Sequence, residues 1–188
     1  GVELVSVTTR QAAVEQASTA DAVIAICSDA LVKAGSRVKW FQLPSAGVEY
    51  CVNAPGVKER KILVTNAQRL YGPEVAEHAI AMMLAFARGF HRFFPEQVKG
   101  RWSPSAVPNQ QRWELKNKTL LVAGLGGIGT EVAWRAHALG MRVTATRRST
   151  REGPEYVSYV GLSDELSKLA AEADVVINAL PLTPETRA

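Results

Sequence analysis

The stretch Thr119-Leu120-Leu121-Val122-Ala123-Gly124-Leu125-Gly126-Gly127-Ile128-Gly129 decides the fold of this chain. An apolar run, typical of a buried strand, leads directly into the pattern G-x-G-x-x-G. A helix-like segment (130–139) and a second apolar run (141–146) follow. In such a β-α-β unit the first glycine permits the tight turn, the second lets a pyrophosphate approach the backbone, and the third lets the helix pack closely against the strand. The spacing therefore predicts a dinucleotide site, with a glycine-rich turn that binds no ligand as the alternative.

The backbone of this turn is expected to make the contacts. Unpaired N–H groups at the start of a helix favour phosphate oxygens, because the helix dipole is positive there. We expect the cofactor to lie against Gly124, Leu125, Gly126, Gly127, Ile128 and Gly129.

The end of the second apolar run indicates which dinucleotide is bound. A site for NAD usually carries Asp or Glu about 20 residues into the motif, where it bonds the ribose 2′-hydroxyl. Here Arg147, Arg148 and Ser149 occupy that place, and the next carboxylate is Glu152. A guanidinium can hold a 2′-phosphate with two charge-assisted hydrogen bonds. We therefore expect NADP to be preferred over NAD, with two solvated arginines at a strand end as the alternative.

Composition narrows the classes of function. With 47% hydrophobic and 21% charged residues the chain has ordinary globular composition. A net charge of +4 without a basic run argues against nucleic acid as a partner. The longest apolar run (79–87) is too short to cross a bilayer and the N-terminus has no signal-peptide layout, so we expect a cytoplasmic protein. Cys27 and Cys51 lack metal-ligand spacing and are expected to be reduced, mostly buried thiols.

The first part of the chain alternates strand and helix signals, which predicts a parallel sheet covered by helices. An Ala-rich helical segment is expected at 11–19, and short strands at 2–7, 22–26, 38–43 and 61–65.

A long helix is then expected over 73–90, because Pro73 suits a first helical position and apolar residues recur at helical spacing. Its apolar residues surround much of the circumference, so we expect it to be covered on most sides. Prolines at 95, 104 and 108 predict an irregular connection over 91–118.

The last part predicts a strand at 156–160, a helix capped by Ser163 and a buried strand at 174–180. The second sheet then has four strands, whereas a doubly wound dinucleotide domain has about six. We therefore expect this chain to be a piece of a longer protein, with a complete small α/β protein as the alternative.

Five blocks of sequence, in order, resemble the D-isomer-specific 2-hydroxyacid dehydrogenases. They are Val38-Lys39-Trp40-Phe41-Gln42-Leu43-Pro44-Ser45-Ala46-Gly47-Val48-Glu49, Thr65-Asn66-Ala67, Val75-Ala76-Glu77-His78, Gly124-Leu125-Gly126-Gly127-Ile128-Gly129 and Leu180-Pro181-Leu182-Thr183-Pro184-Glu185-Thr186-Arg187. The resemblance implies a Rossmann-type doubly wound coenzyme-binding lobe, incomplete here (73–188), and a smaller flavodoxin-like α/β substrate lobe (1–72). Members of this family reduce 2-oxo acids with NAD(P)H.

The resemblance also assigns residues. It implies that backbone N–H groups of the loop that begins at Ser45 hold the substrate carboxylate, through Ala46, Gly47 and Val48. It places Val75 beside the nicotinamide, and Leu180 and Pro181 under the cofactor, with further contacts from Thr183 and Thr186. The family usually has Asp where this chain has Glu49.

The catalytic Arg, Glu and His of the family have no counterpart in this chain, and the resemblance implies that they lie beyond Ala188. His78 shares a helix face with Glu74, and a local helix pair is the simpler interpretation. His91 suits a helix C-terminus, and His137 is expected on the surface.

The sequence leaves three functions open. The first is an NADP-preferring D-2-hydroxyacid dehydrogenase that acts on a small 2-oxo acid such as glyoxylate or hydroxypyruvate, whose fragment alone is inactive. The second is a dinucleotide-sensing protein without turnover. The third is a family member that uses formate or 3-phosphoglycerate. The resemblance further implies a homodimer paired through the helix at 73–90 about a two-fold axis.

Overall fold

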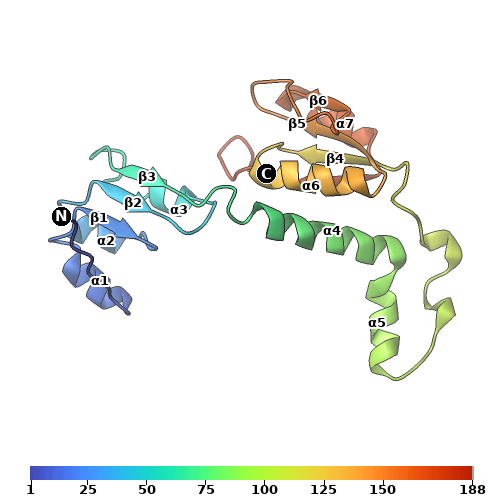
Figure 1. The fold of residues 1–188 in the computed structure, drawn as a ribbon, viewed down its shortest axis with the longest axis horizontal. Helices are drawn as coiled ribbons and strands as arrows, with labels where there is room; N and C mark the ends of the chain where they lie inside the picture. The colour runs from blue at the N-terminus through green and yellow to red at the C-terminus, as the bar shows by residue number, and fades with distance from the viewer. Residues whose placement is uncertain (188) are drawn as a thin grey trace. The chain divides into compact units, whose positions relative to one another are not determined.

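A computed structural model describes residues 1–187 and divides the chain into two compact units (Figure 1). The first unit contains residues 1–70 and the C-terminal residues from Leu182, and the second contains Tyr71–Pro181. The expected boundary after residue 72 falls two residues earlier. The residues from Leu182 onward, expected in the second lobe, group instead with the first unit. Both units have parallel sheets with flanking helices, which confirms the α/β class.

The first unit carries a three-stranded parallel sheet in the order β1-β2-β3. Its core is closed by buried side chains such as Leu31, Phe41 and Leu43. Its elements are α1 (Arg10–Gln16), β1 (Ala22–Ile24), α2 (Asp29–Ala34), β2 (Trp40–Gln42), α3 (Glu49–Val52) and β3 (Leu63–Thr65).

The strand expected at residues 2–7 is wrong. The segment has no regular structure, and Val2 and Leu4 are 98% and 83% exposed. Alternating apolar residues form a strand only when a neighbour supplies hydrogen bonds and a face to pack on. Among the described strands none pairs with this segment.

The expectation of reduced cysteines is also overturned, because Cys27 and Cys51 form a disulfide. Their Cα atoms are 5.6 Å apart and both residues are buried. The sequence separation of 24 residues gave no sign of this proximity, which arises only when the loop after β1 and helix α3 meet in the fold.

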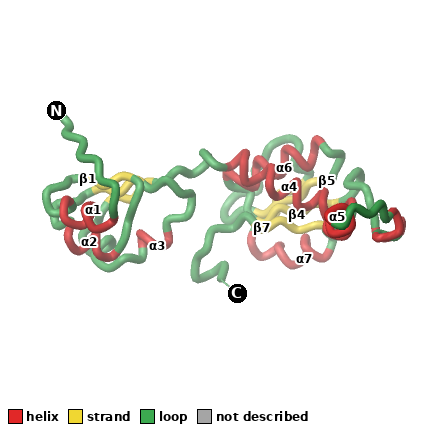
Figure 2. The backbone as a smooth tube through the Cα atoms, turned by 90° about the horizontal axis from the view of Figure 1, so that it is seen from below, coloured by secondary structure: helices red, strands yellow, loops and turns green. Residues whose placement is uncertain are grey.

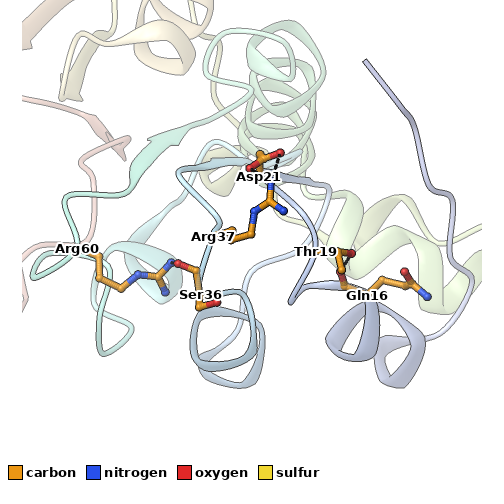
Figure 3. Close-up of polar contacts among 6 residues, drawn as sticks. All are labelled: Gln16, Thr19, Asp21, Ser36, Arg37 and Arg60. Carbon is orange, nitrogen blue, oxygen red and sulfur yellow. Dashed lines mark hydrogen bonds and ion pairs between the residues drawn. The ribbon is translucent and has the colours of Figure 1, made fainter. Parts of the chain in front are cut away.

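Arg60 holds together the chain between α2 and β2 (Figure 3). Its guanidinium donates hydrogen bonds to four backbone carbonyls at distances of 2.7–3.0 Å. The acceptors belong to Val32, Gly35, Ser36 and Val38. Arg37, drawn in the same figure, instead makes an ion pair of 3.0 Å with Asp21 at the surface, where both side chains are more than half exposed.

The second unit has a four-stranded parallel sheet in the order β6-β5-β4-β7, with α4 and α6 on one face and α7 on the other (Figure 2). Its main elements are α4 (Gly72–Arg88), α5 (Phe90–Val98), β4 (Thr119–Ala123), α6 (Gly127–Ala138), β5 (Arg142–Thr146), β6 (Tyr159–Gly161), α7 (Leu166–Ala171) and β7 (Val175–Asn178). Short 3-10 turns are η1 (Pro104–Ala106), η2 (Asn109–Gln111) and η3 (Ser163–Glu165). No helix within residues 1–187 is long and apolar enough to cross a membrane.

Helix α4 confirms the expected long helix and ends where Gly89 adopts a left-handed φ of 75°. A Cβ at Gly89 would lie 2.6 Å from the Val107 side chain, so glycine is required for space as well as for conformation. One face of the helix is buried in the core through Ala76, Ile80, Met83 and Ala87. A salt bridge of 3.2 Å from Arg135 to Glu77 joins α4 to α6.

The irregular connection expected over 91–118 is only partly correct. Its first third is helix α5, which contains Pro95. Proline removes one hydrogen bond within a helix, but contacts between aromatic rings support this turn, with centroids of Phe90 and Phe94 5.5 Å apart. Hydrogen bonds from Lys99 and Arg101 hold the pKa of Glu96 below its ordinary value and fasten the C-terminal end of α5.

The expected Ser163 cap is replaced by a different one. Glu165 reaches back and accepts a hydrogen bond of 2.8 Å from the N–H of Leu162, so a carboxylate rather than the serine hydroxyl closes the first turn. Ser163 lies inside the turn η3, one residue too far along to act as the cap.

Replacement of Arg60 by methionine is expected to lower the free energy of unfolding of the first unit by about 2 kcal/mol or more. The reason is that hydrogen bonds from charged groups contribute roughly 1.5–3 kcal/mol and their loss leaves carbonyls unpaired. Arg37→Met is the matched control and should cost less than about 1 kcal/mol, as exposed ion pairs do. Hydrogen exchange of the β2 amides measures both. Equal protection in the two variants would contradict the role given to Arg60.

Candidate functional site

The glycine turn between β4 and α6 has the geometry that its spacing predicts. Gly124 has a φ of 94°, and a Cβ there would lie 3.0 Å from the carbonyl oxygen of Ala179. A Cβ at Gly129 would collide with the carbonyl oxygen of Gly124. At Gly126, by contrast, a Cβ would meet no atom within 4 Å. Two glycines are therefore required by packing, whereas Gly126 faces open space where a ligand can approach the backbone.

The backbone, rather than the side chains, is available to a ligand here. Leu125 is buried, and Ile128 packs against the hydrophobic core. The N–H groups from Gly126 through Gly129 have no hydrogen-bond acceptor within residues 1–187, apart from any ligand. These N–H groups begin a helix of 12 residues, whose dipole favours an anion at this end.

Thr146 links the glycine turn to the end of β5. Its carbonyl accepts a hydrogen bond of 2.9 Å from the N–H of Leu125, and its hydroxyl accepts one of 3.3 Å from the N–H of Gly124. The sequence analysis missed this residue, although its place directly opposite Ala123 in the parallel register was the available signal. Thr146 thereby brings Arg147 next to the turn.

Arg147 is half-buried, while Arg148 and Ser149 are exposed. The backbone N–H of Arg147 donates to the carbonyl of Gly161 at 3.0 Å. Its side-chain Nε is buried and has no hydrogen-bond partner among the described residues. A buried unpaired donor on a cation costs free energy, and an anion such as a phosphate would satisfy it.

The loop after Arg148 is held by a compact charged network. Glu165 accepts a hydrogen bond of 2.5 Å from the Tyr159 hydroxyl and forms an ion pair with Arg151. The Tyr159 hydroxyl and then the N–H of Leu162 are the main reasons that the pKa of Glu165 is lowered to about 2. Arg151 is therefore engaged within the loop.

The structure brings two of the other expected cofactor residues to the glycine turn. The side chain of Leu180 would lie 3.1 Å from a Cβ on Gly124. Val75 is exposed in the first turn of α4, three residues after Gly72 and so on the same side of the helix. Gly72 itself packs against the carbonyl of Gly127, 3.4 Å from a Cβ position.

The remaining expected contacts lie at or beyond the end of the second unit. Pro181 is exposed at the end of the second unit. Thr183 and Thr186 belong to the first unit, where the N–H of Thr183 donates to the Thr186 hydroxyl at 2.9 Å.

The expected substrate loop lies in the first unit, where the chain leaves the carboxyl end of β2. The carbonyl of Ala46 accepts a hydrogen bond of 2.7 Å from the Asn66 side chain, and the Ser45 hydroxyl donates to the carbonyl of Gly47 at 2.7 Å. The N–H groups of Ala46, Gly47 and Val48 have no acceptor in the described part of the chain. Sequence reasoning missed the tether from Asn66, although its place directly after β3 was a usable signal.

A row of hydrogen-bonded polar side chains lies at the same carboxyl end of the sheet. The Trp40 ring N–H donates to the Thr65 hydroxyl, which in turn donates to the Gln42 side chain, both at 2.6 Å. Glu49 folds back over the loop, with its carboxylate oxygens 3.0 and 3.1 Å from a Cβ position on Gly47. This carboxylate disfavours an anion bound at the loop.

His137 is exposed, as expected, whereas His91 lies in the first turn of α5 and not at a helix C-terminus, so that expectation is wrong. The His91 ring lies 5.2 Å from the Phe86 ring, and the His137 ring 6.1 Å from the Tyr156 ring. No group of three His, Cys, Asp or Glu residues within residues 1–187 could hold a metal ion.

The site fits a dinucleotide on three independent observations. The turn leaves the N–H groups of Gly126 through Gly129 without an acceptor among the described residues, Arg147 carries a buried donor that is unpaired there, and Leu180 packs against Gly124. Gly126 through Gly129 would hold the pyrophosphate and Arg147 with Arg148 the 2′-phosphate. A nicotinamide ring would supply or accept hydride.

Comparison with known proteins gives consistent matches. The family model described as "D-isomer specific 2-hydroxyacid dehydrogenase, NAD binding domain" matches residues 80–188. A hydroxypyruvate reductase from Thermotoga maritima is 34% identical over 157 residues, which are 84% of this chain and 49% of that protein. A D-3-phosphoglycerate dehydrogenase from Methanocaldococcus jannaschii is 29% identical over 191 residues, 99% of this chain and 36% of that protein. The chain thus spans about half or less of the length of these curated relatives.

Among solved structures, a D-isomer specific 2-hydroxyacid dehydrogenase family protein from Aeromonas salmonicida is similar with a TM-score of 0.80. The two sequences are 28% identical, and the match covers 96% of this chain and 56% of that one. The matched region includes both units.

Substitution of Gly126 and Gly129 separates ligand binding from packing. Gly126→Ala should leave the thermal unfolding midpoint nearly unchanged and weaken NADPH binding at least about tenfold. The added Cβ would hold the phosphate away from the backbone, and a charge-assisted hydrogen bond lost in this way costs roughly 1.5–3 kcal/mol. Gly129→Ala should lower stability by about 1–3 kcal/mol or more, as overpacking does. Calorimetry and cofactor fluorescence measure the two effects. Tight NADPH binding by Gly126→Ala would contradict the assignment of the turn.

Proposed function

Because the chain belongs to the family of D-isomer specific 2-hydroxyacid dehydrogenases, we propose that the whole protein transfers hydride between NAD(P)H and a small 2-oxo acid or its D-2-hydroxy acid. The chain carries the NAD-binding domain of this family. The observation that carries the proposal is the glycine turn, whose N–H groups have no acceptor among the described residues and where Gly126 leaves open space beside the backbone. Glyoxylate and hydroxypyruvate are the proposed substrates, while 3-phosphoglycerate and formate are the alternatives that assays must compare.

We place the substrate carboxylate at the loop of Ala46, Gly47 and Val48. Three N–H groups without an acceptor in the described chain form a concave anion site at the carboxyl end of a parallel sheet. Glu49 must turn away from Gly47 when the substrate carboxylate binds, since two like charges repel each other.

NADP is the preferred cofactor in this proposal. Arg147 and Arg148 follow β5 where an NAD site usually has a carboxylate, and Arg151 is already paired with Glu165. The buried, unpaired Nε of Arg147 supports a phosphate contact, because a 2′-phosphate would satisfy it.

We further propose that the whole protein is a homodimer paired through α4 and works in the cytoplasm. Beside its buried face, α4 exposes Val75, Met82 and Phe86, at 43%, 51% and 61%. A separate hollow of about 720 Å³ at α5 is lined by Phe90, Phe94 and Trp102, together with charged residues such as Arg88 and Arg112. Exposed apolar area of this extent is typical of an interface, and a two-fold axis is the commonest arrangement.

The function is tested by hydride transfer. The full-length protein should oxidise NADPH with glyoxylate or hydroxypyruvate, and residues 1–188 alone should show no turnover, because positioned acid–base catalysis contributes about 10²–10⁴ in rate. Absorbance at the nicotinamide band measures both. NADPH binding without turnover of any of the four substrates by the full-length protein would favour a dinucleotide-sensing protein, and turnover by residues 1–188 would direct attention to Glu74 and His78.

Cofactor preference is tested at Arg147. Arg147→Asp in the full-length protein should reverse the preference toward NADH, because a bidentate contact is replaced by repulsion, a change on the order of 2–4 kcal/mol. The measured quantity is the ratio of kcat/KM for NADPH and NADH. Arg151→Asp is the control and should change this ratio little. An unchanged ratio in Arg147→Asp would show that the arginine does not contact the cofactor.

Assembly is tested on the exposed face of α4. Met82→Glu with Phe86→Glu should convert the dimer to monomer at micromolar concentration, since central interface residues contribute about 2 kcal/mol or more each. Met83 is buried and would report on folding instead. Lys168→Glu on α7, across the sheet, is the control (Figure 2). Light scattering that finds an unaltered mass for the double variant would end this part of the proposal.

A further inference from the structure

The substrate loop is tethered on two sides, and the second tether is a disulfide. The three parallel strands of the first unit end in register at Ile24, Gln42 and Thr65. The chain segments that leave these strands therefore lie side by side at the carboxyl end of the sheet. The segment after β1 contains Cys27, the segment after β2 is the loop from Ser45 to Val48, and the segment after β3 begins with Asn66.

From the side of β3 the tether is a pair of hydrogen bonds. The Asn66 side chain donates to the carbonyl of Ala46 at 2.7 Å, and the N–H of Ala67 donates to the carbonyl of Ser45 at 3.1 Å. Both bonds occupy carbonyls, so they fix the loop and leave its N–H groups available.

From the side of β1 the tether is the bond between Cys27 and Cys51. Cys51 lies in α3, which starts directly after Val48, and its N–H donates to the Val48 carbonyl at 2.9 Å. Helix α3 has only four residues. A helix of one turn has little stability of its own, so its position depends on the groups that hold it.

The backbone of Ala25 shows how the segment after β1 is held. Its φ of 81° is left-handed, a conformation that alanine adopts at a cost. Its N–H still donates to the Gln42 carbonyl at 2.9 Å. The turn thus stays attached to β2 and directs the chain toward Cys51.

We propose that Cys27 and Cys51 are positioning residues for the carboxylate-binding loop, so that opening their disulfide weakens substrate binding and leaves dinucleotide binding unchanged. The inference rests on the proposed function, because it takes the loop as the carboxylate site. The glycine turn belongs to the other compact unit, which is why the effect is confined to one ligand.

The chemistry requires a dithiol reductant. One of its thiolates attacks a disulfide sulfur and forms a mixed disulfide, which releases the first cysteine as a thiolate. The second thiol of the reductant then closes its own disulfide and releases the other cysteine. Two electrons and two protons pass to the protein, and the reductant is oxidised. Cys27, at 7% exposed, is the more accessible of the pair, and the chain has no third cysteine to exchange with.

The test compares the oxidised and dithiothreitol-reduced forms of the full-length protein with hydroxypyruvate and NADPH. Thiol titration should find both cysteines of this chain blocked before reduction and free afterwards. Reduction should raise KM for hydroxypyruvate about tenfold, below the hundredfold that a 1 Å misplacement can cost. KM for NADPH and kcat should change less than about twofold, a split that a general loss of stability would not produce. Reoxidation should restore the first KM.

Variants distinguish the loss of the disulfide from any other effect of dithiothreitol. Cys27→Ser with Cys51→Ser should behave as the reduced form and no longer respond to dithiothreitol, and the double alanine variant serves if the serine pair does not fold. Asn66→Ala removes the other tether and should raise KM for hydroxypyruvate while it keeps the response to reduction. An equal KM in both redox states, or free thiols in the protein as purified under air, would overturn the inference.

A separate binding experiment applies if the proposed function itself is wrong. If neither redox form turns over substrate, calorimetric titration with oxalate as a carboxylate probe still decides the inference. Tighter oxalate binding by the oxidised form supports it. Equal binding in both forms, or none in either, overturns it.

Discussion

The close contact between Gly129 and the carbonyl of Gly124 is the constraint on which the second unit depends. No side chain fits there, so α6 approaches β4 more closely than any other residue would allow. This approach places the first N–H groups of α6 at the carboxyl end of the sheet, beside the end of β5. Thr146 then bonds to Gly124 and Leu125, and the same closeness lets Gly72 bring the start of α4 against Gly127.

The loop of the first unit is held in position in a different way. There the loop from Ser45 to Val48 is fixed by side chains that reach it from neighbouring strands, and Arg60 supports the far end of the sheet through four carbonyls. A site held by backbone packing tolerates few substitutions, but it does not depend on hydrogen bonds from distant side chains. A loop held by tethers can be adjusted one tether at a time.

Sequence reasoning succeeded where local rules suffice. The segment from 119 to 146 was predicted because glycine spacing and two apolar runs define a β-α-β unit without reference to distant residues. The helix at 73–90 was recognised from its period, although the pattern could not tell the buried Met83 from the exposed Met82. Arg147 was placed correctly at the strand end, but its unpaired Nε depends on packing that no local pattern describes.

The failures share a cause, which is that pairing between distant segments is not written in a single sequence. Residues 2–7 alternate like a strand and have no neighbour to complete it. Cys27 and Cys51 lie 24 residues apart in sequence, and only the fold brings them together. Pro95 was taken as a break, yet aromatic contacts around it stabilise α5. The hydrogen bonds of Thr146 and Asn66 belong to the same class, because each joins one strand end to the next.

Trp40 gives the molecule a built-in spectroscopic reporter. It is the one tryptophan of the first unit, since the other three, Trp102, Trp113 and Trp134, belong to the second. Its ring N–H is bonded to Thr65 at the sheet edge that carries the substrate loop. Two separate hydrophobic cores need not unfold in a single transition. Fluorescence from a protein that keeps Trp40 alone would therefore follow the first unit by itself, and would resolve its loss of structure from that of the second.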